Sequence, residues 1–189
     1  MVTDMAWLSG HAFLMLLDAT VSPSDVPAGV AAAREAGLAG VVLYPSHLGV
    51  AGDTGELTVA AVVGYPSGRH HTLVKAAEAR LAVAQGATEV WLTPDPTIED
   101  PNTLLAEFVA VREAVPPPVT LAVYLESGQQ EVAEAAALAG VDRLITGASS
   151  SGLPRTAPAD TLDAVITALE QGADRVAVSS VAAVCPPPG

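Results

Sequence analysis

Residues 58–93, TVAAVVGYPSGRHHTLVKAAEARLAVAQGATEVWLT, decide the fold. An apolar run at 58–63 is followed by an Ala-rich helical stretch that ends at Gly86, and a second apolar run occupies 89–93. Both runs are largely apolar without alternation, which is typical of strands covered on both faces. The order strand, helix, strand predicts two parallel strands joined by a right-handed crossover.

The same unit recurs along the chain. Gly140 and Gly172 also end Ala-rich stretches shortly before an apolar run. No Gly-x-Gly-x-x-Gly turn follows the first strand, which favours a barrel over a doubly wound sheet. We therefore predict an α/β fold, a parallel TIM-type barrel that is incomplete or has seven recognisable strands. The other predicted strands are Phe13–Leu17, Val41–Tyr44, Thr120–Leu125, Arg143–Thr146 and Arg175–Val178.

Composition limits the domains and the partners. We expect one barrel domain over residues 1–184 and a Pro-rich tail over 185–189. The formal net charge of -13 repels polyanions, so neither nucleic acid nor a membrane is expected as a partner. The apolar run Ala12–Leu17 is too short to span a bilayer. The single cysteine, Cys185, cannot form an internal disulfide, which fits a reducing, cytoplasmic location.

Several motifs together resemble one enzyme family. Val63–His70, followed by Val74–Glu78, looks like the third strand and helix of deoxyribose-phosphate aldolases. The combination of these blocks is specific, whereas each block alone is weak. Further similar stretches are Asp18–Thr20, Gly86–Val90, Leu121–Ser127, Ala139–Asp142 and Gly172–Ser180.

The resemblance implies a class I aldolase that needs no cofactor. In that family a strand-six lysine forms a Schiff base with the substrate, a strand-seven lysine perturbs it, and a strand-four aspartate and a strand-five lysine move protons. Here these positions fall on Ile145, on a segment that is cut short, on Trp91 and on Ala122. The shortened segment, residues 149–156, is expected to join the sixth strand directly to the last helix. The sequence thus predicts a barrel without the reactive amine.

Lys75 is the only lysine in the chain. It falls early in the third helix, and helices of such barrels start at the face that carries active sites. We interpret it as a surface lysine paired with Glu78 or Asp53. The alternative is a relocated Schiff-base lysine.

The resemblance also implies a phosphate-binding corner. Ser179 and Ser180 end the last strand, where the family holds the substrate phosphate, and Gly152 and Arg155 are expected to add to it. The competing interpretation is that Ser179 and Ser180 only cap a terminal helical turn. No metal is expected, because His47, His70 and His71 lack a chelating spacing.

Three hypotheses for function remain open. The first is a pseudoenzyme that binds a sugar phosphate, or another phosphorylated small molecule, or serves as a partner subunit. It would be a homo-oligomer, or a hetero-oligomer with an active aldolase paralogue, because a missing strand–helix unit exposes an edge. The second is a carbon–carbon lyase or isomerase that uses Asp18, Glu126, a histidine or Lys75. The third is a scaffold whose barrel is filled, with Trp91 in the place of a substrate.

Overall fold

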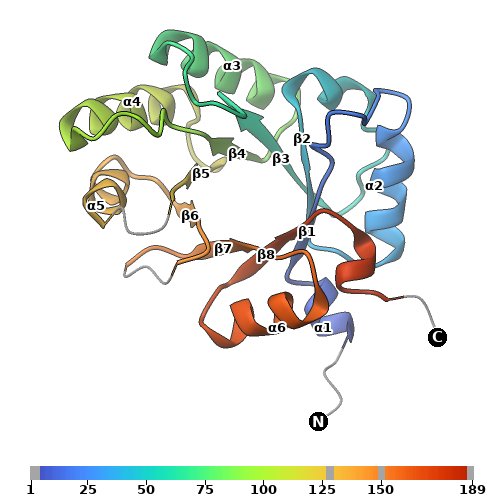
Figure 1. The fold of residues 1–189 in the computed structure, drawn as a ribbon. Coiled ribbons are helices and arrows are strands. Elements are labelled where there is room, and N and C mark those ends of the chain that lie inside the picture. The colour runs from blue at the N-terminus through green and yellow to red at the C-terminus, as the bar shows by residue number, and fades with distance from the viewer. Residues whose placement is uncertain (1–4, 127–129, 149–151, 187–189) are drawn as a thin grey trace.

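The computed structural model describes residues 5–126, 130–148 and 152–186, which form a closed barrel of parallel strands in sequence order, β1 to β8 (Figure 1). This confirms the predicted TIM-type α/β barrel. The strands are β1 (Ala12–Met15), β2 (Gly40–Leu43), β3 (Thr58–Val63), β4 (Glu89–Leu92), β5 (Thr120–Tyr124), β6 (Arg143–Ile145), β7 (Arg155–Pro158) and β8 (Arg175–Val178).

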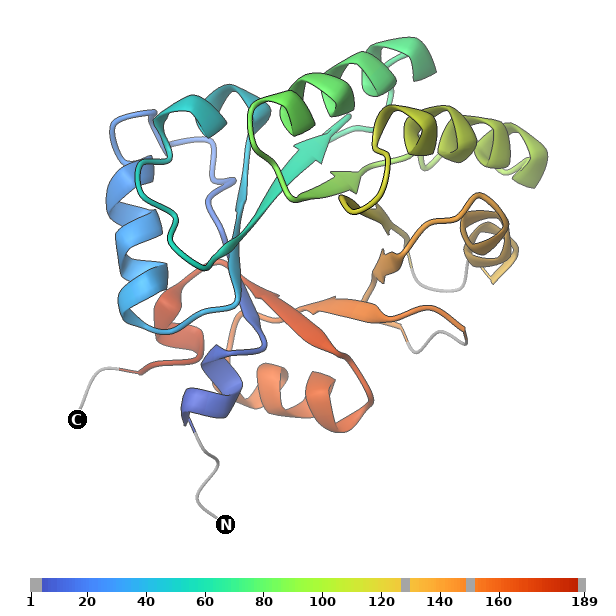
Figure 2. The same cartoon turned by 180° about the vertical axis from the view of Figure 1, so that it is seen from behind.

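The count of seven strands was wrong, because β7 is present. It pairs with β6 through Leu144 and Arg155 and with β8 through Thr156 and Arg175. Sequence reasoning missed it because a short run with arginine at its start and proline at its end has no apolar signal. The described residues between β6 and β7, 146–148 and 152–154, form no helix (Figure 2). Residues 149–151 of the predicted connection lie outside the described ranges.

Closure removes one argument for a partner. The predicted exposed edge does not exist, since β7 bonds to both neighbours and β1 pairs with β8. A closed sheet has no unpaired strand to cover. Pairing of strand edges is therefore excluded as the basis of an oligomer.

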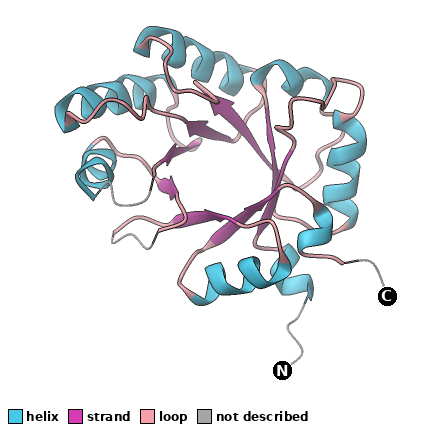
Figure 3. Cartoon of the chain, viewed as in Figure 1, coloured by secondary structure: helices cyan, strands magenta, loops and turns pink. Residues whose placement is uncertain are grey.

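The helices surround the strands on the outside of the barrel (Figure 3). The start of α4 follows its sequence signature, because the Asp100 carboxylate accepts hydrogen bonds from the N–H groups of Asn102 and Thr103 and proline occupies the first turn. In the described part of the chain, no helix has the length and apolarity needed to cross a membrane. The helical segments are α1 (Met5–Ser9), α2 (Val26–Glu35), η1 (Pro45–Val50), α3 (Thr72–Ala84), α4 (Pro101–Ala114), α5 (Gln130–Leu138), α6 (Leu162–Glu170) and η2 (Val181–Ala183).

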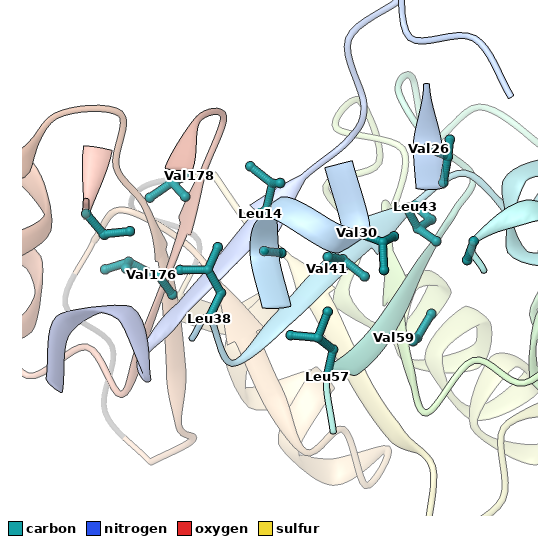
Figure 4. Close-up of a cluster of buried hydrophobic side chains, with 14 of the residues drawn as sticks. Leu14, Val26, Val30, Leu38, Val41, Leu43, Leu57, Val59, Val176 and Val178 are labelled. Atoms are coloured by element: carbon teal, nitrogen blue, oxygen red, sulfur yellow. The ribbon is translucent and has the colours of Figure 1, made fainter. Parts of the chain in front are cut away.

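Alternate strand residues build two kinds of core. Outward-facing residues such as Leu14, Val41 and Val176 pack against the helices in one buried cluster (Figure 4). Phe13, at the next position in β1, belongs to a separate cluster that fills the barrel interior. This inner cluster also holds Val42, Ala60, Val62, Trp91, Ala122, Ile145 and Ala177.

The beginning of the predicted tail is held against the barrel domain. The Cys185 Sγ lies 3.3 Å from the Ser9 Oγ in α1, and its backbone N–H donates to the carbonyl of Val181. The chain is therefore anchored at Cys185, whereas residues 187–189 lie outside the described ranges.

Candidate functional site

A cavity of about 780 Å³ opens at the carboxyl ends of the strands. Active sites of parallel barrels lie at this end, because the loops that follow the strands meet there. Trp91 belongs to the apolar cluster inside the barrel and also lines this opening, so the barrel interior is filled while its mouth is open. The lining residues are Met15, Leu17, Asp18, Val62, Tyr65, Pro66, Trp91, Thr93, Tyr124, Glu126, Ile145, Pro158, Ala177 and Ser179.

The indole of Trp91 forms the floor of the cavity and is held there by a hydrogen bond. Trp91 is only 5% exposed, and its Nε1 donates to the Glu89 Oε1 at 2.8 Å. The other oxygen of Glu89 accepts from the Arg175 Nη1 at 2.8 Å, and that guanidinium lies 4.9 Å from the ring centroid of Phe13. Because the Trp91 N–H is already hydrogen-bonded to Glu89, it is not available as a donor to a ligand, and Trp91 contributes only its ring to the cavity.

The structure brings the two predicted carboxylates, Asp18 and Glu126, to the same mouth. Asp18 follows β1, and its carboxylate accepts from the Thr20 hydroxyl at 2.6 Å and from the Thr20 N–H at 2.8 Å. These two bonds hold the pKa of Asp18 below its ordinary value of 3.8, the hydroxyl contributing most. Asp18 is therefore an anion at neutral pH.

Removing the Thr20 hydroxyl by Thr20→Val should raise the pKa of Asp18 toward its ordinary value. A carboxyl with a depressed folded-state pKa contributes stability above its unfolded pKa, and this contribution is lost as pH falls through the folded pKa. The difference in the free energy of unfolding between wild type and Thr20→Val should thus be constant from neutral pH down to 3.8. Below pH 3.8 the difference should decrease and disappear. Urea unfolding over this pH range measures it. A difference that grows on acidification would contradict the assignment.

A carboxylate lies in the predicted phosphate corner. The backbone N–H of Ser179 donates to the Asp160 Oδ1 at 3.0 Å, so this donor is already used by an anion of the chain. Ser179 lines the cavity, whereas Ser180 caps η2 by accepting from the Ala182 N–H at 3.2 Å. The capping interpretation therefore describes Ser180, and only Ser179 reaches the cavity.

Gly152 and Arg155 lie away from this corner. Both precede or begin β7, so they belong to the amino end of the barrel, opposite the mouth. Arg155 is buried, and its guanidinium donates to the carbonyls of Gln171 at 3.2 Å and of Ala168 at 3.5 Å near the end of α6. The existence of β7 explains the difference from the predicted phosphate corner, because a connection leading directly from the sixth strand to the last helix would have lain at the mouth.

Lys75 does not line the cavity. Its side chain is 1% exposed, and its Nζ lies 2.8 Å from the Glu107 Oε1 in α4. The predicted surface pairing was wrong: the Glu78 carboxylate accepts from the Gly64 N–H, and Asp53 pairs with an arginine. Gly64 makes room for the buried lysine, since a Cβ there would lie 3.1 Å from the Lys75 Cε.

The remaining positions divide clearly. Ile145 and Trp91 line the cavity, while Ala122 is buried deeper in the barrel interior. Sequence reasoning did not single out Tyr65 and Tyr124, although Tyr65 follows β3 and Tyr124 ends β5. Their position at the carboxyl ends of strands was the signal that would have found them.

The described residues contain no group of side chains suited to a metal ion. In residues 5–126, 130–148 and 152–186, no three His, Cys, Asp or Glu side chains are placed to hold a metal ion. No protein-family model matches the chain.

Curated relatives do match. The chain is 41% identical over 140 residues to a deoxyribose-phosphate aldolase of Corynebacterium jeikeium, covering 66% of this chain and 56% of that protein. It is 43% identical over 136 residues to the deoxyribose-phosphate aldolase of Nocardia farcinica, covering 67% and 60%. The matched region thus spans less than two thirds of the length of these relatives.

Solved structures show the same fold. The aldolase QR15 superposes with a TM-score of 0.84 at 23% identity, over 93% of each chain. The deoxyribose phosphate aldolase from Aeropyrum pernix, described as a unique tetramer, gives a TM-score of 0.85 at 23% identity, over 95% of this chain and 90% of that one. The sequence relatives support the deoxyribose-phosphate aldolase family for this chain, and the solved structures share its barrel fold.

Proposed function

We propose that this protein is an aldolase-like barrel that binds a small molecule and does not perform Schiff-base chemistry. One observation carries the proposal: no lysine is among the described residues that line the cavity, and Lys75, the only lysine of the chain, is buried in an ion pair with Glu107. An imine requires an unprotonated amine that a carbonyl carbon can reach. A carbonyl carbon cannot reach Lys75, since its side chain is 1% exposed and its Nζ lies 2.8 Å from the Glu107 carboxylate.

The residues at the family's catalytic positions support the proposed absence of Schiff-base chemistry. Ile145, where the resemblance puts the reactive lysine, lies at the cavity wall, and Trp91 replaces the proton-relaying aspartate beside it. Neither side chain can act as a nucleophile or transfer a proton at neutral pH. The cavity itself is retained, which supports binding as the function of the site.

Self-association is the second part of the proposal. Closure of the barrel removes the edge as its basis, but α3 exposes Leu73 at 71% and Leu81 at 56%, and α5 exposes Leu138 at 79%. Exposed apolar side chains favour burial against another chain where they form a contiguous patch. The tetrameric Aeropyrum relative is consistent with an oligomer here. Light scattering across a concentration series tests this, and a monomer at all concentrations would refute it.

A lyase or isomerase without an imine is the alternative, because Asp18 and Glu126 share one mouth. A positioned pair of carboxyl groups is suited to general acid–base catalysis. Turnover of 2-deoxyribose 5-phosphate that is insensitive to borohydride and is lost in Asp18→Asn would favour this alternative over the binding protein.

Reductive trapping tests the proposal directly. Treating the pure protein with acetaldehyde and borohydride should leave Lys75 unmodified, as read by peptide mass mapping, because the amine is buried and paired. Mapping is needed since the N-terminal amine also reacts. The double variant Lys75→Met with Glu107→Leu, which has no side-chain amine and leaves no unpaired buried carboxylate, is the matched control. An adduct on Lys75, or cleavage of 2-deoxyribose 5-phosphate that the folded double variant lacks, would overturn the proposal.

A further inference from the structure

We propose that the cavity selects a small organic cation, a hydroxylated molecule that carries an ammonium group, in preference to a phosphorylated ligand. This inference rests on the proposed function, that the cavity binds a small molecule. It concerns the ligand class, and it follows from the charge of the mouth, from the backbone donors that are already used, and from the aromatic lining.

The formal charges that line the cavity are all negative. Asp18 and Glu126 are the charged residues in the lining, and no lysine, arginine or histidine is among the described lining residues. An adjoining cleft of about 80 Å³ contains Asp95, but its charge is opposed by Arg69 at 3.7 Å, so the carboxylates of the cavity lining remain the relevant charges. A dianionic phosphate would meet repulsion here, whereas an ammonium would meet attraction.

The donors that would hold a phosphate are occupied by the chain's own acceptors. The Ser179 N–H is bonded to Asp160 at 3.0 Å, and the first N–H groups of α4 are bonded to Asp100. The Thr161 hydroxyl accepts from the Ala164 N–H at the start of α6. The start of α4 thus already faces a carboxylate, and the start of α6 has one of its N–H donors used by a hydroxyl.

Most arginines lie at the other end of the barrel. Arg34 and Arg112 stand in the last turns of α2 and α4, which run back toward the amino ends of the strands. They pair there with Asp53 and Asp142 at 2.7 and 2.6 Å. Arg69, which follows β3 at the mouth, lies 3.7 Å from Asp95 and so already has an acidic partner. The field at the mouth is therefore set by carboxylates.

Aromatic rings supply the second half of a cation site. Tyr65, Tyr124 and Trp91 line the cavity, and Tyr44 stacks edge-on against Tyr65 with ring centroids 5.8 Å apart. The Tyr44 hydroxyl is fixed by its bond to the carbonyl of Leu17. Ring faces attract ammonium groups, and the attraction increases when the cation is desolvated. Carboxylates beside aromatic rings are a combination that recognises amines and has no comparable attraction for phosphate.

A series of three probes on one carbon skeleton tests the inference: 3-amino-1,2-propanediol, glycerol and glycerol 3-phosphate differ in charge and little else. Trp91 is the reporter, because replacing the other tryptophan by Trp7→Phe leaves it as the only indole. We expect the amine to bind about tenfold or more tightly than the phosphate, as one charge-assisted contact implies. The affinity for the amine should also decrease with added salt.

Variants separate the possible outcomes. Asp18→Asn should weaken amine binding about tenfold and leave glycerol binding unchanged, whereas Glu113→Gln, an exposed acid in the last turn of α4, should change neither. Tighter binding of glycerol 3-phosphate than of the amine would overturn the cation inference and leave the binding function standing. Failure of all three probes to bind would overturn both.

Discussion

Glu107→Ala should lower the free energy of unfolding by about 3–5 kcal/mol, as does the loss of one partner from a buried ion pair. The change leaves the Lys75 ammonium in a site where its side chain is 1% exposed. It also removes the acceptor of the Thr72 hydroxyl at the start of α3. Urea unfolding followed by far-UV circular dichroism measures the effect.

The same pair offers its own controls. Lys75→Met with Glu107→Leu removes both charges and fills the space, so the double variant should recover most of the lost stability. Asp53→Ala breaks an ion pair of similar length, 2.7 Å, whose side chains are 42% and 77% exposed, and should cost at most about 1 kcal/mol. If Glu107→Ala were as mild as Asp53→Ala, Lys75 would have to be accessible, and the proposal that it is purely structural would fail.

Glu89→Ala should lower the free energy of unfolding by about 3 kcal/mol, because it leaves two donors inside the barrel without an acceptor. Glu89 is 1% exposed, and its carboxylate accepts from both the Trp91 indole and the Arg175 guanidinium at 2.8 Å. The Arg175 side chain is 28% exposed, which keeps the expected cost at the lower end of the range for buried pairs. Urea unfolding in the Trp7→Phe background measures it.

Trp91 emission gives a second reading of the same change. Releasing its Nε1 should let the indole reorient at the cavity floor, so the emission spectrum of Glu89→Ala should shift before any unfolding. Glu89→Gln keeps an acceptor for the indole and should preserve the spectrum while losing part of the stability. An unchanged spectrum in Glu89→Ala would mean that Glu89 does not hold the floor of the cavity.

The two buried pairs and the rim acids have different roles. The ion pair of Lys75 with Glu107 holds α3 against α4. The ion pair of Arg175 with Glu89 holds the floor of the cavity. Asp18 and Glu126 line the opening of the cavity. The proposed binding function assigns these carboxylates and the aromatic rings beside the opening to the ligand, and the buried lysine to stability.

By itself the sequence determined the barrel and much of its mouth. Continuous apolar runs with glycine-terminated helices located seven of the strands, since burial on both faces leaves a local pattern that needs no partner to be recognised. Because residues after parallel strands gather at one end, the same pattern placed Asp18, Glu126 and Ser179 together.

Only the tertiary structure decided β7 and the partners of the charges. β7 is defined by its hydrogen bonds to β6 and β8, and Arg155 and Pro158 conceal it from any apolar pattern. Lys75 pairs with Glu107, which is 32 residues away in the sequence. Asp160 accepts a hydrogen bond from the Ser179 N–H, which is 19 residues away. Pairings of this kind join segments from different turns of the barrel, so their energy depends on the packed chain and leaves no mark in local sequence.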